Sequence, residues 1–304
     1  MKVGGQAEWL LEPQTPDELQ QAWAAAHDSG LPVRLLGAGA DLIVDDGVHR
    51  GVVIATTRVD RIFRPGTVET ETPFDVGIEA ASRVAPAELT SDPRLVAWCG
   101  ASLPGLVRAA SELGWSGLEG LVGVPGKVGG AIATNAGGRW GDIWDVVESL
   151  RVLTSAGEVL DLDRKDCSPS YRDGQIGKRV VVAAVLRLEP ESKAQVKDRA
   201  RQYLLEKNRV QPVTEACAGC IFKNPDKELS DGRSAGQLIH QLGLRGLERG
   251  GAVVSPLHGN FIINRGGALA QDVFGLIDEL KKRVADETGV ELECEVRRWL
   301  VEDN

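Results

Sequence analysis

The spacing of apolar and polar positions near the start of the chain predicts a helix followed by two strands. Residues 15–18 read Thr-Pro-Asp-Glu, a capping box with proline at the first helical position, and the pattern after it predicts a helix that stops at Gly30. Short apolar runs at residues 33–36 and 51–55 predict the strands. A tight glycine turn separates them, so the opening is predicted to be βαβ-like.

The same kind of pattern predicts the elements of the middle and end of the chain. Ser102-Leu103-Pro104 is a cap for a helix that ends at Gly114. Residues 65–93 have little periodicity and are interpreted as an extended excursion of strands and loops. The other expected elements are a hairpin at 150–163, an apolar strand at 179–188, helices at 193–209, around 235–242 and at 270–288, and strands at 252–255 and 261–264.

The composition of the chain changes after residues 189–191, where it becomes charged and helical. We place a domain boundary there. The predicted domains are residues 1–189, with a division into two subdomains near 57–65, and residues 190–304. A chain of 304 residues is long enough for two or three cores.

Two glycine-rich stretches are candidates for ligand contact. Gly37-Ala38-Gly39-Ala40-Asp41 follows a predicted strand, and such a turn lets backbone N–H groups approach a phosphate, although a Gly-x-Gly loop is as often only a turn. Between residues 117 and 138 glycine is too dense for most of the stretch to be helix or sheet interior. This backbone is suited to lie against a flat or anionic group; the alternative is a glycine-rich interdomain loop.

The overall charge limits the class of partner. The chain has 42% hydrophobic and 26% charged residues, and 35 basic against 44 acidic residues give a formal net charge of −9. We therefore expect no nucleic-acid or membrane partner, and any anionic ligand must be held by local groups. The amino terminus has no apolar signal region and no run approaches the roughly 18 apolar residues that span a bilayer, so the expected location is cytoplasmic.

The five cysteines are odd in number and mostly far apart, at positions 99, 167, 217, 220 and 294, which is not the pattern of a secreted disulfide framework. Reduced thiols are expected. A Cys-x-x-Cys pair such as Cys217 and Cys220 can be redox-active or bind zinc. Zinc would require a second pair or clustered histidines, and the four histidines are scattered, so no metal site is expected.

The segment 218–227 carries the most informative chemistry. It puts the thiol of Cys220 beside Lys223 and Asn224 on a turn that contains glycine. An unperturbed thiol has a pKa of about 8.5 and acts as an acid near neutrality more readily than a serine hydroxyl. The segment is therefore suited to deliver a proton beside a bound anion; the alternative is a buried cysteine at a strand end.

Taken in order, the motifs of the chain resemble those of the UDP-N-acetylenolpyruvoylglucosamine reductase family, whose members catalyse the second step of peptidoglycan precursor synthesis. The resemblance runs from Val3 to about Arg298, and its most specific motifs are Phe-Lys-Asn-Pro at 222–225 and Pro-Gly-x-Val-Gly-Gly at 125–130. It is also carried by Gly37–Asp41, Asn135-Ala136-Gly137, Tyr171-Arg172, Ala235-Gly236-Gln237, Val254-Ser255, His258-Gly259-Asn260-Phe261 and Glu293-Cys294-Glu295-Val296-Arg297.

This resemblance implies an α+β fold in which a vanillyl-alcohol-oxidase (PCMH) type FAD-binding module is followed by a smaller α/β substrate-binding domain. The implied cofactors are FAD and NADPH. The short step from Arg172 to the strand at 179 is similar to the shorter type of the family, which lacks a tyrosine-bearing insertion. The implied FAD contacts are Gly37, Gly39, Ala40, Asp41, Pro125, Gly126, Gly129, Gly130, Asn135, Ala136 and Gly137.

The resemblance further implies reduction of UDP-N-acetylglucosamine enolpyruvate to UDP-N-acetylmuramate, with hydride passing from flavin N5 to C3 and a proton to C2. Cys220 stands where the family usually has the proton-donating serine. Arg172 and Glu295 match the other catalytic residues, although singly they would be an ordinary ion-paired and a solvated residue. Tyr171, Lys223 and Asn224 are the implied substrate contacts; for Lys223 and Asn224 the alternative is a structural turn.

The chain departs from the family pattern in ways that affect its chemistry. Cysteine in place of serine makes the proton donor sensitive to oxidation, and our hypothesis is that Cys217 and Cys220 form a disulfide that switches the enzyme off. Ala40 and Asp41 replace a Ser-Asn pair, which removes two donors near the phosphates, so FAD is expected to bind more weakly or through backbone groups alone. Two alternative functions stay open: another FAD oxidoreductase of the same fold, and a degenerate module without FAD.

Overall fold

The computed structural model describes residues 1–66, 72–75, 77–79 and 92–301. The chain forms two compact units, each assembled from separate stretches of sequence. The first unit comprises residues 1–9, 39–51 and 206–304, and the second comprises residues 10–38 and 52–205. This division groups residues 39–51 with the end of the chain, and the predicted functional boundary near residue 190 stays a prediction.

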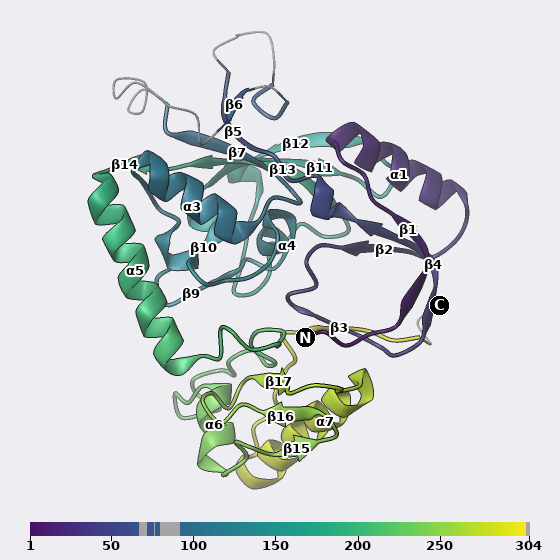
Figure 1. Ribbon diagram of the computed structural model, residues 1–304, viewed down its shortest axis with the longest axis vertical. Coiled ribbons are helices and arrows are strands. Elements are labelled where there is room, and N and C mark those ends of the chain that lie inside the picture. The colour runs from purple at the N-terminus through teal and green to yellow at the C-terminus, as the bar shows by residue number, and fades with distance from the viewer. Residues whose placement is uncertain (67–71, 76, 80–91, 302–304) are drawn as a thin grey trace. The chain divides into compact units, whose positions relative to one another are not determined.

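The second unit is built on a six-stranded antiparallel sheet (Figure 1). Its central strand β13 is apolar over its whole length except the last residue and is buried on both faces. In sheet order the strands are β12 (Val159–Asp163), β11 (Val147–Leu153), β13 (Val180–Arg187), β7 (Arg94–Trp98), β5 (Ile62–Pro65) and β6 (Gly77–Glu79). The hairpin predicted at 150–163 and the strand predicted at 179–188 are confirmed.

Two capped helices belong to this unit. Helix α1 (Pro16–Asp28) begins where Thr15 accepts a hydrogen bond from the Glu18 amide at 3.1 Å. Helix α3 (Leu103–Leu113) begins at the Ser102 cap and ends at Gly114, which adopts φ +76°. Both helices bury their apolar faces in the main core of the unit, so the predicted cap signals act as expected.

A three-stranded sheet has the order β1 (Gln6–Leu11), β4 (Val48–Ala55) and β2 (Val33–Leu36). Strands β2 and β4 are parallel, with Val33 opposite Val52 and Leu36 opposite Ala55. The helix and the two strands predicted for this region are confirmed, but the strands are not joined by a tight turn alone, because strand β3 (Leu42–Val44) lies between them in the sequence.

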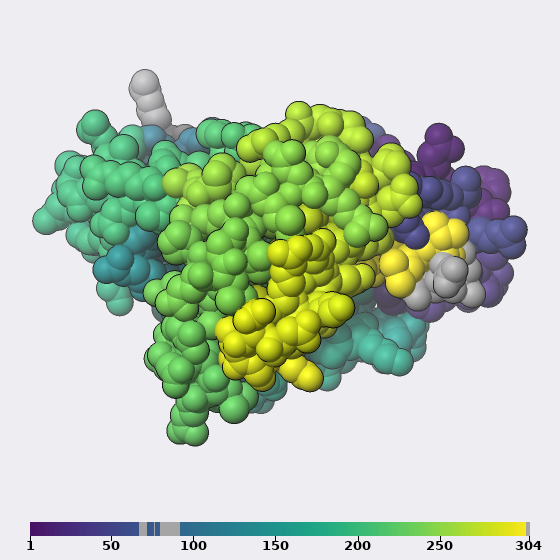
Figure 2. Space-filling model, turned by 90° about the horizontal axis from the view of Figure 1, so that it is seen from below, coloured from purple at the N-terminus to yellow at the C-terminus, as the bar shows by residue number. Residues whose placement is uncertain are grey.

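The first unit contains a three-stranded antiparallel sheet of β15 (Glu248–Arg249), β16 (Ala252–Val254) and β17 (Ile262–Asn264). Helices α6 (Ala235–Gln241) and α7 (Ala270–Thr288) share one apolar core with this sheet. Strand β18 (Arg297–Trp299) pairs in parallel with β3 (Leu42–Val44), which brings the end of the chain beside residues 42–44. Figure 2 shows, in light green to yellow, the surface of the part of the first unit that includes α6 and α7.

Short elements connect these sheets and helices. Helix α5 (Lys193–Val210) matches the helix predicted at 193–209. Within the glycine-rich stretch, where most residues were predicted to be irregular, one short helix does form: α4 (Val128–Ala133), which includes Gly129 and Gly130. None of the described helices is long and apolar enough to cross a membrane. The remaining elements are η1 (Thr56–Arg58), β8 (Trp115–Ser116), η2 (Glu119–Leu121), β9 (Gly137–Gly138), β10 (Gly141–Asp142), η3 (Ile143–Asp145), η4 (Arg164–Asp166) and β14 (Glu189–Pro190).

Candidate active site

The glycine-rich stretch of the second unit packs against the end of β7. The amides of Val128 and Gly129 donate to the carbonyl oxygens of Ala101 and Cys99 at 3.0 and 2.8 Å. A Cβ on Gly129 would lie 2.9 Å from the Cβ of Cys99, so this position requires glycine. Gly126 adopts φ +121°, a backbone angle that residues other than glycine rarely adopt. The backbone is therefore shaped by close packing on one side.

The opposite side of the same stretch is open. A Cβ on Gly130 or on Gly138 would have no described atom within 4 Å. A Cβ on Gly37 would lie 3.7 Å from the side chain of Lys127, so the first glycine turn approaches α4 closely. Because bare backbone N–H and Cα groups are exposed here, the surface can accept a flat or anionic group at short range.

Asn135 lies immediately after α4 and has an incompletely satisfied side chain. It is only 7% exposed, adopts φ +44°, and donates from Nδ2 to the carbonyl oxygen of Ser170 at 2.9 Å. Its Oδ1 is buried and has no hydrogen-bond partner among the described residues. A buried acceptor without a partner costs free energy, so a donor from a bound group would fit at this position.

Arg172 lies against the same loop. Its Nη2 donates to the carbonyl oxygen of Gly137 at 2.9 Å, and its Nη1 contacts the carbonyl oxygen of Asn135 at 3.4 Å and a carboxylate oxygen of Asp142 at 3.6 Å. Its backbone adopts φ +58°, and its guanidinium lies 5.0 Å from the ring centroid of Tyr171. The structure thus brings the predicted residues Asn135, Gly137, Tyr171 and Arg172 together.

In the first unit, Cys220 lies at the start of an extended segment that is held on both sides. The Ile221 amide donates to the carbonyl oxygen of Asn260 at 2.9 Å, and the Ile221 carbonyl accepts from the Glu295 amide at 2.8 Å. Cys220 and Glu295 are both half-buried. A single residue, Ile221, therefore links the backbone positions of the predicted proton donor and the predicted catalytic glutamate.

The predicted substrate residues of this unit already have partners. Lys223 Nζ forms an ion pair with Glu293 Oε1 at 2.6 Å. The exposed Asn224 accepts from the Ala235 amide at 3.3 Å, at the start of α6. Both residues therefore stabilise the local fold, and a ligand contact from either would be made in addition to these bonds.

The second half of the first glycine turn belongs to this unit as well. Gly39 adopts φ +63°, and Ala40 and Asp41 are half-buried. The carbonyl oxygen of Asp41 accepts from the Arg297 amide at 3.0 Å, two residues after Glu295. The strand pair β3 and β18 thereby fixes the turn beside the segment that carries Glu295.

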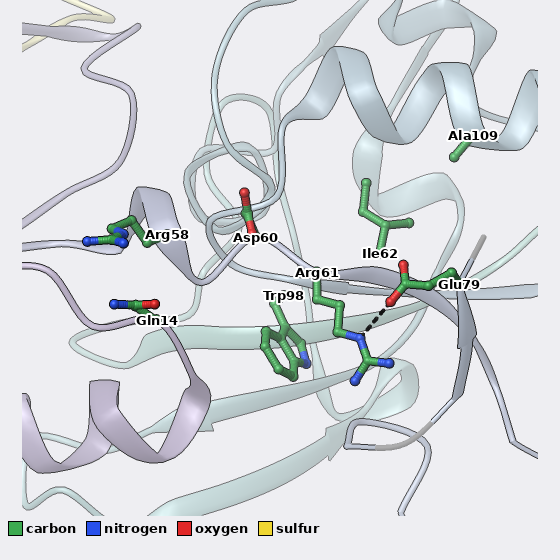
Figure 3. A pocket seen from close by; sticks show the side chains of 8 residues that line it. All are labelled: Gln14, Arg58, Asp60, Arg61, Ile62, Glu79, Trp98 and Ala109. Atoms are coloured by element: carbon green, nitrogen blue, oxygen red, sulfur yellow. Dashed lines mark hydrogen bonds and ion pairs between the residues drawn. The ribbon is translucent and has the colours of Figure 1, made fainter. Parts of the chain in front are cut away.

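A separate pocket of about 600 Å³ lies in the second unit (Figure 3). Figure 3 shows Arg61 directed toward Glu79, with which it forms an ion pair of 2.9 Å. None of the predicted site residues lines this pocket, so it does not belong to the candidate active site. Its lining residues are Gln14, Arg58, Asp60, Arg61, Ile62, Glu79, Trp98 and Ala109.

The open glycine backbone and the buried oxygen of Asn135, which has no partner in the described part of the chain, are features that suit a bound flat or anionic group. The family model described as "FAD binding domain" matches residues 7–72 and 84–163, which places this part of the chain among FAD-binding proteins. A second family model, described as "UDP-N-acetylenolpyruvoylglucosamine reductase, C-terminal domain", matches residues 211–299. The two matches cover the glycine-rich stretch and the segment of Cys220 and Glu295.

Full-length relatives agree with both matches. A UDP-N-acetylenolpyruvoylglucosamine reductase of Geotalea uraniireducens is 36% identical over 298 residues, covering 98% of this chain and 89% of that protein. One of Trichlorobacter lovleyi is 37% identical, covering 98% and 88%. The crystal structure of UDP-N-acetylenolpyruvylglucosamine reductase from Thermus caldophilus has a TM-score of 0.72 at 32% identity and covers 98% of this chain and 94% of that one.

The chain therefore belongs to the UDP-N-acetylenolpyruvoylglucosamine reductase family. The fold class, the oxidoreductase activity and the cofactors FAD and NADPH that the sequence motifs implied are confirmed at the level of this family. The roles of the individual site residues stay predictions.

Sequence reasoning overlooked the contribution of Asn260. The sequence shows it only as part of the His-Gly-Asn-Phe motif, whereas in the structure its side-chain amide bonds to the backbone of Phe222. A buried amide in a short motif is a signal for such a contact, because a buried polar side chain needs hydrogen-bond partners. Glu293, the ion-pair partner of Lys223, likewise stands out in the sequence only as part of the motif at 293–297.

Proposed function

We propose that this chain reduces the enolpyruvyl group of UDP-N-acetylglucosamine enolpyruvate to the lactyl group of UDP-N-acetylmuramate, using NADPH. Membership of the reductase family supports this reaction. We place the enzyme in the cytoplasm with small-molecule partners and with no nucleic-acid or membrane partner, which the net charge of −9 supports.

The two glycine-rich stretches and the residues beside them would hold FAD. Gly130 offers an open backbone position, Pro125, Gly126 and Gly129 lie in the same stretch, and the buried Oδ1 of Asn135 offers an acceptor that lacks a partner within the described chain. Ala136, Gly137, Gly37, Gly39, Ala40 and Asp41 complete the proposed set. When bound, FAD would supply the hydride chemistry, accepting a hydride from NADPH and delivering it to C3 of the enolpyruvyl group.

Hydride addition at C3 leaves negative charge on C2 and the substrate carboxylate, and the protein must stabilise this charge where it develops. Arg172 is suited to this role because its planar guanidinium can bind a carboxylate through two parallel hydrogen bonds. Its guanidinium is held by the loop at 135–137 through the bond from Nη2 to the Gly137 carbonyl, which supports a fixed position for this group.

Cys220 would donate the proton to C2, and Glu295 would hydrogen-bond the substrate carboxylate or a neighbouring water. The hydrogen bond of 2.8 Å between the Glu295 amide and the Ile221 carbonyl carries this proposal, because it fixes the acid and the glutamate relative to one another. After proton transfer the cysteine is a thiolate, which regains its proton from solvent before the next turnover. Tyr171, Lys223 and Asn224 would contact the substrate diphosphate or sugar.

The proposal is tested with the purified, FAD-reconstituted protein under anaerobic conditions. NADPH consumption is followed together with formation of the lactyl product. Turnover is expected to depend on the enolpyruvyl substrate and to be lost in Cys220→Ala, while Cys220→Ser, which restores the usual acid of the family, keeps substantial turnover. Flavin reduction by NADPH without product formation in the unmodified protein would contradict the proposed substrate.

A further inference from the structure

Asn260 contacts residues 221 and 222, which follow Cys220, through both its side chain and its backbone. Its Oδ1 accepts from the Phe222 amide at 2.9 Å and its Nδ2 donates to the Phe222 carbonyl at 2.8 Å. Its own carbonyl accepts from the Ile221 amide at 2.9 Å. The side-chain amide thus occupies the position of a peptide group in a neighbouring strand and pairs with both backbone groups of a single residue.

The same segment is held from its other side by the segment that carries Glu295. The Ile221 carbonyl accepts from the Glu295 amide at 2.8 Å, and the Lys223 amide donates to the Glu293 carbonyl at 2.9 Å. Residues 221–223 therefore lie between Asn260 and the residues 293–295. Where Cys220 lies relative to Glu295 depends on the backbone conformation of this segment.

Asn260 is itself fixed. It is 3% exposed, and its backbone N–H donates to Nδ1 of His258 at 3.1 Å. The preceding Gly259 packs so closely that a Cβ there would lie 2.7 Å from the carbonyl oxygen of Gly236. Phe222 is 1% exposed, so if the Asn260 side chain is removed, no solvent is available to form its hydrogen bonds to the Phe222 backbone.

We propose that Asn260 is a positioning residue for proton transfer, which holds the peptide after Cys220 so that the thiol and the Glu295 carboxylate keep their arrangement. The inference rests on the proposed function. Asn260 takes no part in binding FAD or NADPH, and its effect is confined to the step in which the substrate receives hydride and proton.

The test separates the two half-reactions in the FAD-loaded full-length protein by anaerobic stopped-flow spectroscopy. The first is reduction of the flavin by NADPH, and the second is reoxidation of the reduced flavin by UDP-N-acetylglucosamine enolpyruvate. In Asn260→Ala, we expect flavin reduction within about threefold of the unmodified protein and reoxidation by substrate slower by roughly tenfold or more, since one positioned proton-transfer group contributes on the order of 10²-fold.

Asn264→Ala is the matched control. Asn264 lies in the same unit and also bonds to backbone groups, accepting from the Gly266 amide at 2.8 Å and donating to the Met1 carbonyl at 3.2 Å. Its side chain has no hydrogen bond to residues 220–223 or 293–295 among those of the described chain. Both half-reactions are expected to be unchanged in this variant.

Asn260→Asp supplies a second readout and serves if Asn260→Ala does not fold. The carboxylate still accepts from the Phe222 amide but cannot donate to the Phe222 carbonyl, whereas the protonated acid can do both. Reoxidation in this variant is therefore expected to recover as the pH is lowered, over a range in which the unmodified protein does not gain activity. A loss of structure would change flavin reduction as well, so a recovery confined to reoxidation separates positioning from a merely structural role.

The outcomes distinguish the inference from the function on which it rests. If the unmodified protein is not reoxidised by the substrate, the proposed function and the inference with it are wrong. If the unmodified protein turns over and both Asn260 variants keep its reoxidation rate within twofold, only the inference is wrong. Equal losses in both half-reactions would also contradict it, because they would show a general effect on the fold.

Discussion

Arg172 donates a hydrogen bond of 2.9 Å from Nη2 to the carbonyl oxygen of Gly137, at the end of the loop that contains Asn135 and Ala136. Arg172, the proposed contact for the substrate carboxylate, is therefore bonded directly to the backbone that is proposed to bind FAD. A change in this loop is expected to affect cofactor and substrate together. The φ of +58° at Arg172 is uncommon for a side-chain residue and is found mostly where the surroundings fix the backbone.

Arg172→Lys tests the role of the forked guanidinium. Lysine keeps the charge but cannot make two parallel bonds to a carboxylate, so we expect kcat to fall by roughly 10²–10³, the loss typical of one transition-state donor. Steady-state kinetics with NADPH and the enolpyruvyl substrate measures it. Arg164→Lys, at a site where within the described chain the arginine bonds to the Cys167 carbonyl and lies over Trp144, is the control and should keep its activity. Equal activities of the two variants would contradict the role of Arg172.

Gly130→Ala tests whether the open face of α4 receives the cofactor. The new Cβ meets no described atom within 4 Å, so the apoprotein should gain about 0.5–1 kcal/mol of stability from replacing glycine within a helix. If FAD occupies this space, its dissociation constant should rise by roughly tenfold, or about 1.4 kcal/mol. Thermal unfolding of the apoprotein and flavin fluorescence titration measure the two effects. A stabilised protein with unchanged FAD affinity would show that FAD lies elsewhere.

The buried carboxylate of Glu119 is expected to make the stability of the second unit sensitive to acid. It is 4% exposed, and burial by itself would raise its pKa, but hydrogen bonds from Arg199 at 3.0 Å and from the Gly117 amide at 2.7 Å hold the pKa below its ordinary value of 4.5. Arg199→Leu leaves this carboxylate without its charged partner and should destabilise the protein by about 3–5 kcal/mol at neutral pH. Urea unfolding measures the loss.

The sign of the pH effect follows from the lowered pKa. The native state binds fewer protons at Glu119 than the unfolded state, so the stability from this group is full above pH 4.5 and is lost as the pH falls below it. Glu119→Gln should therefore show a weaker decline of stability in this acidic range. Glu112→Gln, which removes an exposed carboxylate paired with Lys193 and Lys197, should change stability by less than about 1 kcal/mol. Equal effects of the two substitutions would contradict the importance of burial.

Oxidation should reversibly inactivate the enzyme through Cys217 and Cys220. Both thiols are half-buried, and Gly219 between them adopts φ +74° with open space around it. A peroxide would oxidise the Cys220 thiolate to a sulfenic acid with release of hydroxide, and the Cys217 thiol would then form the disulfide with loss of water. Mass spectrometry should find this bond, and dithiothreitol should restore activity. Loss of activity without the bond would refute the hypothesis.

Two further measurements complete the cysteine experiment. In Cys217→Ser, inactivation should proceed to products that dithiothreitol does not reverse, because no second thiol is in place to trap the sulfenic acid. Cys99 serves as the internal control, since burial raises the pKa of its thiol to about 12 and it is 2% exposed. Native Cys99 should resist alkylation under conditions that modify Cys220.

Local signals in the sequence predicted the helices well. Thr15 starts a helix through a side-chain bond and Gly114 ends one through its positive φ, and α7 covers the whole range 270–288 that its apolar spacing indicated. The glycine-rich stretch was harder, because α4 forms where helix propensity is low. Packing explains this: Gly129 lies against Cys99 with no room for a Cβ, and the tertiary contact outweighs the propensity of glycine.

The sequence by itself determined the class of fold, the reductase family, the glycine backbone for the cofactor and the identity of the candidate acid, because these depend on residue types at short spacing. Only the tertiary structure decided how the segments meet. The pairing of Leu42–Val44 with Arg297–Trp299 and the bonds from Asn260 to Phe222 join residues far apart in the chain. Such contacts form when the chain closes on its apolar core, and buried polar groups then take the partners that the core leaves within reach.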